Sequence, residues 1–331
     1  MRTGRQLKSR KGFSLVEILI AVAILSIVSI AAVGLFFAFT KHFEQSADLT
    51  AARQRGEMAL SRLETAVLQA GLSMPNKTSD FEDALVVNTT PKIDLITALR
   101  NATGSVWNEP VYLYGENFTV TDDGSETKYY RKLGIVYCLS SGIGVLGEEH
   151  DVDVYDPNDS DTEQELELST ACPENQVRVA TSPARTDGWV TFSGCQTPFV
   201  VNDITSDRKK LTVITSKRDL IPFFAELQYL RALCAYVISP GGTSPQFYVQ
   251  DVTRGPAQPA VEGVSQVLFT FDDSGTDATN VLTVHLLVRG NRRFPGQVTS
   301  GVPGWPVSST ITDEDRHYRL IAISASWRVR N

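Results

Sequence analysis

The first 70 residues carry one helical pattern that changes character halfway. Residues 13–39 are apolar apart from a few serines, a glycine and Glu17, their only charged residue. That run exceeds the roughly 20 residues that a helix needs to cross the core of a bilayer. Further on, apolar and small residues recur every three or four positions, which is typical of an amphipathic helix: Leu49, Ala52, Gly56, Leu60, Leu63, Val67 and Ala70. With Gly71 and Pro75 as end signals, the pattern predicts one helix from about residue 13 to about residue 70.

Beyond Pro75 the hydrophobic period changes to two residues, which predicts strands. The clearest alternating segments are 128–141, 209–215, 233–239, 246–250, 266–271, 280–289 and 319–329. No helical pattern recurs between them, so we expect a mainly antiparallel sheet. The predicted fold is α+β, with a long N-terminal helix packed on a mainly antiparallel β-sheet domain.

Charge is distributed unevenly along the chain. The net charge is −7, yet the first 12 residues contribute five positive charges and no negative one. Without them, 26 basic residues face 38 acidic ones, a net charge of −12. Basic residues beside an apolar helix stay in the cytoplasm. We therefore expect a single-pass inner-membrane protein with a cytoplasmic N-terminus and an exported acidic body, which disfavours nucleic acid as a partner.

The four cysteines all lie in the part of the chain expected to be exported. They are Cys138, Cys172, Cys195 and Cys234. An even number in an oxidising compartment predicts two disulfides, with three possible connectivities. Strand-like sequence around Cys138 and Cys234, and irregular sequence around the other two, favours the pairs Cys138–Cys234 and Cys172–Cys195. The alternative is four buried free thiols.

The sequence around Gly12 and Phe13, KGFSLVEILIAVAIL, resembles the signal of type IV prepilins. An ordinary secretory signal has a shorter apolar core and a small-residue cleavage site, and an uncleaved anchor would not explain Glu17. The resemblance implies that prepilin peptidase cuts between Gly12 and Phe13 and then methylates the new N-terminus of Phe13. In that family the glutamate at the position of Glu17 is thought to meet the N-terminus of a neighbouring subunit.

The chemistry of the cut end fits that assembly role for Glu17. Cleavage would leave an α-amino group on Phe13, and such groups are largely cationic near neutral pH because their ordinary pKa is about 8. Phe13 and Glu17 are four residues apart and share a helix face. An amine and a carboxylate in apolar surroundings each need a partner. The alternative is that Glu17 only reaches toward the membrane surface as an anchor residue.

The C-terminal third deepens the resemblance. The segments VEGVSQVLFTF, NVLTVHLLVRG and HYRLIAISASWRVRN resemble the ends of PilW-type minor pilins, which are related to the J-type pseudopilins of type II secretion. The resemblance implies a pilin-like division into a basic leader (1–12), a membrane and fibre-core helix (13–39), an amphipathic half-helix (40–71) and an exported β-rich domain (72–331).

It further implies a minor pilin that acts as a structural and assembly subunit of a type IV pilus and is not an enzyme. Its partners would be the peptidase, other major and minor pilins and the inner-membrane assembly machinery, and its final location the pilus at the cell surface. The alternatives are a type II secretion pseudopilin and a membrane-anchored binding or enzymatic domain.

Two further motifs lie between residues 142 and 161. GIGVLG matches the dinucleotide pattern G-x-G-x-x-G, but the acidic, proline-containing sequence after it does not favour the helix that such a site needs. The run that follows offers hard oxygen ligands of the kind that Ca²⁺ takes: Asp151, Asp153, Asp156, Asn158, Asp159 and Asp161. Because its spacing is not that of an EF-hand, we favour a solvated acidic loop over a calcium site, and we expect no other cofactor.

Overall fold

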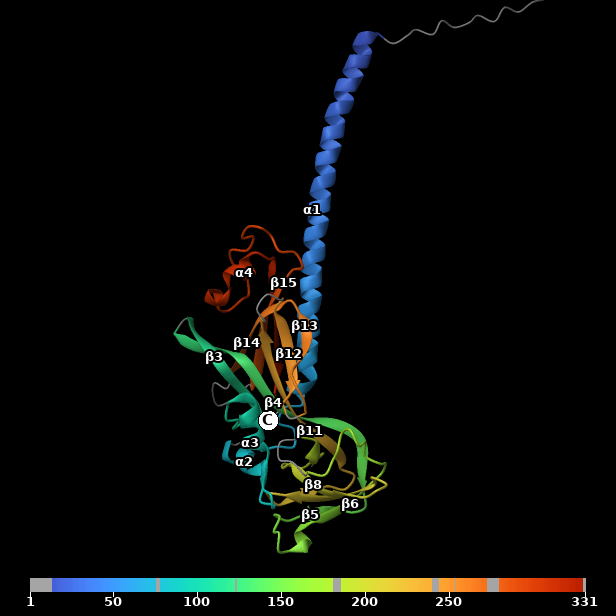
Figure 1. Ribbon diagram of the computed structural model, residues 1–331, viewed down its shortest axis with the longest axis vertical. Coiled ribbons are helices and arrows are strands. Elements are labelled where there is room, and N and C mark those ends of the chain that lie inside the picture. The colour runs from blue at the N-terminus through green and yellow to red at the C-terminus, as the bar shows by residue number, and fades with distance from the viewer. Residues whose placement is uncertain are drawn as a thin grey trace, which may run out of the picture. The chain divides into compact units, whose positions relative to one another are not determined.

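The structure is a computed structural model that describes residues 14–75, 78–122, 124–180, 186–239, 244–252, 254–272 and 280–329. The chain forms two compact units, Met1–Thr50 and Ala51–Asn331. Helix α1, Leu15–Leu68, is continuous from the first unit into the second (Figure 1). The long helix expected from the sequence is therefore confirmed, and it continues past Gly34 without a break.

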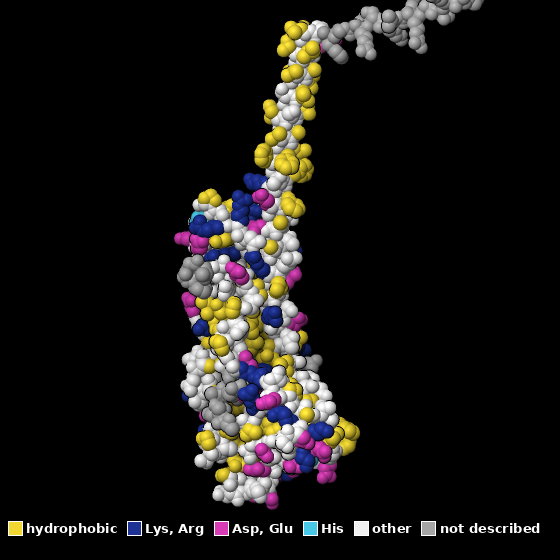
Figure 2. Space-filling view, turned by 45° about the vertical axis from the view of Figure 1, so that its right-hand side comes forward, with side chains coloured by type: hydrophobic (Ala, Val, Ile, Leu, Met, Phe, Trp, Pro, Cys, Tyr) yellow, Lys and Arg dark blue, Asp and Glu magenta, His cyan; other side chains and the backbone are white. Residues whose placement is uncertain are grey.

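Over its described residues, 14–50, the first unit presents an apolar helix whose hydrophobic side chains are exposed. Its large hydrophobic side chains from Leu15 to Phe43 are more than half exposed, and Figure 2 shows them along the visible length of this part of α1. This is the one candidate membrane span among the described residues, long and apolar enough to cross a bilayer.

The second half of α1 packs one face onto the body. The predicted stripe is buried from Ala52 onward, with Leu63, Val67 and Ala70 fully inaccessible. Gly56 allows the closest approach, because a Cβ built there would lie 2.4 Å from Ile323 Cδ1. The helix ends at Leu68, and Gly71 follows with a φ of +70° and a backbone N–H that donates to Val136 O at 3.2 Å.

Most strands of the body join a single 12-stranded sheet. Its larger part comprises β3 (Val111–Asp122), β4 (Ser125–Leu146), β11 (Glu226–Ile238), β12 (Gln246–Asp251), β13 (Gln258–Glu262), β14 (Val264–Asp272), β15 (Val281–Arg289) and β16 (Leu320–Arg328). The strands predicted at residues 280–289 and 319–329 are confirmed as β15 and β16. Leu282, Val284 and Leu286 are fully buried, and Ile323 packs beside them against α1, while Leu287 is buried on the other face of β15.

A second part of the sheet closes into a ring. In it, β4 pairs with β6 (Gln164–Leu168), which continues through β9 (Lys210–Thr215), β8 (Phe199–Ile204) and β7 (Trp189–Phe192) to β11, and β11 pairs with β4 again. The residues inside form a separate apolar cluster that includes Phe192, Phe199 and Val213. All pairings between named strands are antiparallel among the described residues, as predicted.

Short elements complete the body. Helices α2 (Thr78–Ala84) and α3 (Leu95–Thr103) cover a third cluster around Trp107. Two-residue strands β1 (Val86–Val87) and β2 (Ile93–Asp94) pair between these helices, and β5 (His150–Val152) pairs with β10 (Asp219–Ile221). Helix α4 (Asp313–Arg316) lies in the connection between β15 and β16. The GIGVLG segment runs from β4 into a turn before β5, and no helix starts there.

Candidate functional site

The N-terminal end of α1 is capped by side chains of its own first residues. Ser14 precedes the helix, and its Oγ accepts a hydrogen bond from the N–H of Val16 at 3.3 Å. In return, the N–H of Ser14 donates to Glu17 Oε2 at 2.9 Å. This arrangement closely matches a capping box, in which a serine before the helix and a glutamate three residues later satisfy free N–H groups at the helix end.

The cap gives Glu17 a local task that our sequence analysis missed. The signal was present, since S-x-x-E before an apolar run is the pattern of a capping box and Ser14-Leu15-Val16-Glu17 matches it. A carboxylate in the first turn is also favoured by the helix dipole. Gly12 and Phe13, the predicted cleavage residues, lie outside the described residues, so the cut and the pairing of Glu17 with a neighbouring amine stay predictions.

The four cysteines are free and buried. Burial raises the pKa of the Cys138, Cys195 and Cys234 thiols to about 12, so these three are protonated and poorly nucleophilic. Tyr114 Oη donates to Cys234 Sγ at 3.1 Å, while Cys138 Sγ donates to Leu72 O at 3.2 Å.

The register of β4 and β11 argues against the predicted pair Cys138–Cys234. Cys138 lies opposite Leu230, and Cys234 lies opposite Gly134, four residues further along. That displacement is on the order of 13 Å, whereas a disulfide needs Cα atoms within about 7 Å. The strand register is therefore incompatible with the expected Cys138–Cys234 disulfide. Cys172 and Cys195 share the ring cluster but are not bonded either, and their pairing stays a prediction.

Carboxylates of the acidic run bind an arginine and backbone N–H groups of the chain itself. Asp151 and Asp153 both contact Arg218, the latter at 3.3 Å, and the Arg218 hydrogen bond lowers the pKa of Asp151. Asp156 Oδ1 accepts from the N–H of Asn158 at 2.9 Å, and Asp159 Oδ1 from the N–H of Asp161 at 3.0 Å. Within the described part of the chain, no three His, Cys, Asp or Glu side chains converge as a metal site.

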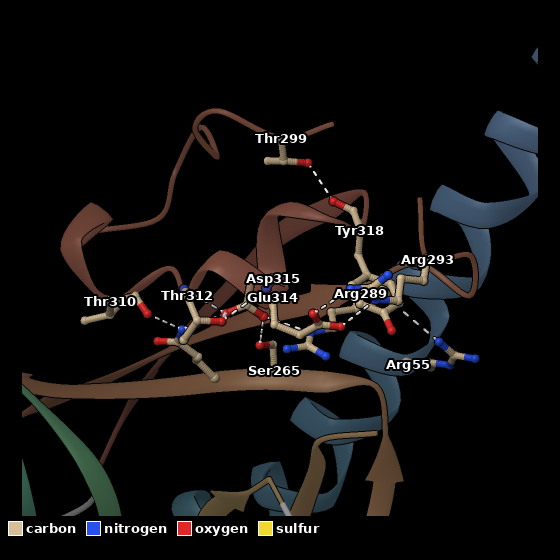
Figure 3. Close-up of polar contacts among 11 residues, drawn as sticks. Arg55, Ser265, Arg289, Arg293, Thr299, Thr310, Thr312, Glu314, Asp315 and Tyr318 are labelled. Atoms are coloured by element: carbon tan, nitrogen blue, oxygen red, sulfur yellow. Dashed lines mark hydrogen bonds and ion pairs between the residues drawn. The ribbon is translucent and has the colours of Figure 1, made fainter. Parts of the chain in front are cut away.

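A buried carboxylate fixes the β15–β16 connection to the sheet (Figure 3). Asp315 Oδ1 accepts from Arg289 Nε at 2.8 Å and from the Ser265 hydroxyl, while Asp315 Oδ2 accepts from the N–H of Thr312 at 3.0 Å. Burial raises the pKa of Asp315, but the hydrogen bonds from Ser265 and Thr312 and the charge of Arg289 outweigh burial and lower it. From α1, Arg55 Nη1 donates to Arg289 O at 3.4 Å and links the helix to this cluster.

Comparison with known proteins assigns the N-terminal segment and leaves the body without a match. Residues 7–33 match the family model of the prokaryotic N-terminal methylation motif. No curated protein and no solved structure matches the chain significantly. This motif heads a long apolar helix that is joined to an antiparallel β body. The chain therefore has a type IV prepilin-like N-terminus, which indicates a structural protein anchored in the membrane by α1.

Proposed function

We propose that the chain is a minor pilin of the PilW type, a structural and assembly subunit of a type IV pilus. The observation that carries the proposal is the methylation motif at residues 7–33 on an unbroken helix, Leu15–Leu68. An apolar helix with no cover of its own can pass from lipid into the core of a fibre, since both surround it with apolar groups. The body remains outside the membrane, with the helix stripe from Ala52 to Ala70 already buried on it.

Processing precedes assembly in this proposal. Prepilin peptidase cuts between Gly12 and Phe13 and methylates Phe13, and the chain then waits in the inner membrane with its N-terminus at the cytoplasmic side. The basic residues before Gly12 support this orientation. Glu17 then pairs with the Phe13 amine of an adjacent subunit, while other pilins and the inner-membrane machinery supply the remaining contacts.

The location of the processed chain tests the pilus assignment. We expect an immunoblot of sheared pili to contain the shortened chain, and we expect a Gly12→Leu variant to remain at full length in membranes. The same motif heads pseudopilins, so the processed chain would be absent from sheared pili but required for protein secretion if it belongs to a type II system. That result would overturn the pilus assignment and keep the prepilin one.

A further inference from the structure

The turn between β10 and β11 holds two phenylalanines in an unusual backbone. The N–H of Ala225 donates to Pro222 O at 3.1 Å, which places Phe223 and Phe224 at the centre of a β-turn. Phe224 has a φ of 60°, in the left-handed region. A turn with positive φ at this third position normally takes glycine or asparagine. A bulky aromatic residue there is an outlier of the kind that points to a function.

Neither ring is buried in the body. Phe224 is 74% exposed and Phe223 51% exposed, and their ring centroids lie 3.9 Å apart in an edge-to-face arrangement. The N–H of Val145 donates to Ala225 O at 2.8 Å, so the next residue of β4, Leu146, itself 42% exposed, lies beside this turn. We call Leu146, Phe223 and Phe224 the aromatic corner.

The backbone of the aromatic corner is fixed by contacts with the segment around Ser193 and Gly194. Pro222 packs on Gly194, where an added Cβ would lie 2.8 Å from Pro222 Cγ. On the other side, the N–H of Ser193 donates to Glu226 O at 2.9 Å, and the N–H of Glu226 donates to Ser193 Oγ at 2.8 Å. Apolar groups presented on a fixed backbone lose little conformational entropy when they bind. The aromatic corner is therefore preorganised as an anchor.

The segment that follows the aromatic corner's Leu146 along the chain is acidic. Residues 146–165 contain nine Asp and Glu residues and no Lys or Arg. The pairing of β5 with β10 places Asp151 opposite Leu220, three residues before Phe223, and Arg218 offsets only part of this charge. Figure 2 shows acidic, basic and hydrophobic side chains close together on the lower part of the body. An apolar centre with a charged border is the usual anatomy of a protein interface.

We propose that the aromatic corner inserts into an apolar pocket bordered by Lys and Arg on a different protein. Exposed aromatic anchors are typical of residues that dominate binding, and the acidic border selects a basic partner surface. A second copy of this chain would present the same acidic border, and anionic lipid headgroups would be repelled as well. The proposal does not depend on how the N-terminal helix is assembled.

Site-specific photocrosslinking in the native host tests the partner. Two full-length chains carry p-benzoylphenylalanine at position 223, one with Phe and one with Gly at position 224. A control chain carries the same amino acid at Val298, another exposed hydrophobic position (46%). We expect one discrete protein adduct from position 223, at least tenfold weaker with Phe224→Gly, and none from position 298. Peptide mapping of the adduct should place the crosslink at an apolar site flanked by Lys or Arg.

Other results would overturn the proposal. These are adducts equal to those at position 298, an adduct with a second copy of the chain, an adduct with lipid or glycan, or a crosslink to a site without basic neighbours. A thermal melt completes the test, because glycine relaxes the backbone at position 224. We expect Phe224→Gly to melt at the same or a higher temperature than the wild type, and a lower one would show that the ring supports the fold instead.

Discussion

Glu17 combines two possible contacts that call for different chemistry. As a cap, its Oε2 accepts from the N–H of Ser14 in its own chain, and a neutral amide oxygen can do the same, since glutamine also serves in capping boxes. As a partner of a neighbouring Phe13 amine, it must be negatively charged. The two contacts are compatible, because a carboxylate has two oxygens and about four acceptor positions. Charge is thus the property that separates assembly from capping.

We expect both Glu17→Gln and Glu17→Leu to be cut normally but to enter pili poorly. Glutamine keeps the cap and loses the charge, whereas leucine loses both. Removing one partner of a buried ion pair costs about 3–5 kcal/mol, and that cost falls on the assembled state. The measurement is an immunoblot of sheared pili against membranes for the two variants and the wild type.

A Glu17→Gln chain that assembles like the wild type would contradict the pairing role and leave the cap as the function of Glu17. Glu17→Asp serves as the charge-retaining comparison. It keeps the negative charge with a shorter reach, so we expect its incorporation to lie between that of the wild type and that of Glu17→Gln.

At the scale of elements, the contact between α1 and β16 depends on the absence of a side chain. At Gly56 a Cβ would meet Ile323 Cδ1 at 2.4 Å and Val288 Cγ2 at 3.3 Å. Alanine there would gain helix propensity of about 1 kcal/mol and displace only the end of Ile323. A larger side chain would push the helix from the sheet.

We therefore predict that Gly56→Leu lowers the free energy of unfolding by about 1–3 kcal/mol, the usual cost of overpacking a well-packed core. Glu57→Leu is the matched control, because Glu57 is the next residue on α1 and its side chain is exposed. Urea unfolding followed by circular dichroism measures both. Equal midpoints for the two variants would contradict the close packing at Gly56.

The β15–β16 connection should carry a pH-dependent share of stability through Asp315. Its pKa is lowered in the folded state, so the folded state binds fewer protons than the unfolded state below the ordinary Asp value of about 3.9. The stabilisation from Asp315 is fully present above that value and is lost as the pH falls through the lowered folded pKa. Acid should therefore loosen this connection.

The variant Asp315→Asn should lose about 3–5 kcal/mol at neutral pH, since Arg289 is left without its buried partner. It should also show a shallower loss of stability than the wild type as the pH falls below about 4, the ordinary Asp value. Glu314→Gln is the control, because its ion pair with Arg293 is solvent-exposed and surface pairs contribute little. Equal acid dependence in wild type and Asp315→Asn would refute the role of this carboxylate.

The elements that sequence predicted well are those with a strong local signal. Helix α1 combines a long apolar run with an amphipathic stripe, and β15 and β16 carry alternating residues that pack against α1 on one face of the sheet. The ring escaped prediction as a unit. Its strand β7 is buried on both faces and does not alternate, and β4 contributes its 22 residues to both the ring and the larger sheet. Such sharing depends on distant pairings that a local pattern does not contain.

The cysteines show the same limit at the level of sites. Their residue types and strand contexts were visible in the sequence, but the register that separates Cys138 from Cys234 arises from the pairing of β4 with β11. At the N-terminus, by contrast, the signal is local, and the methylation motif at residues 7–33 was recognisable from the sequence alone. Its cap at Ser14 was equally local and was overlooked.

For the whole molecule, the motif, the apolar helix and the acidic body fit a protein divided between two environments. The five basic residues before Gly12 and the net charge of −12 beyond them match a cytoplasmic leader and an exported domain. Within the described residues, the first unit offers an apolar surface without any cover of its own. We therefore expect this helix to be released from its leader and to become an assembly surface.

Mass spectrometry of the N-terminus, on chain purified from membranes and from sheared pili, tests whether the leader is removed and Phe13 methylated. We expect a mature chain that begins with N-methylated Phe13 in both fractions, with the residues before it removed. Full-length chain with Met1 to Gly12 still attached in assembled fibres would contradict it, as would cleavage at a site beyond the apolar helix.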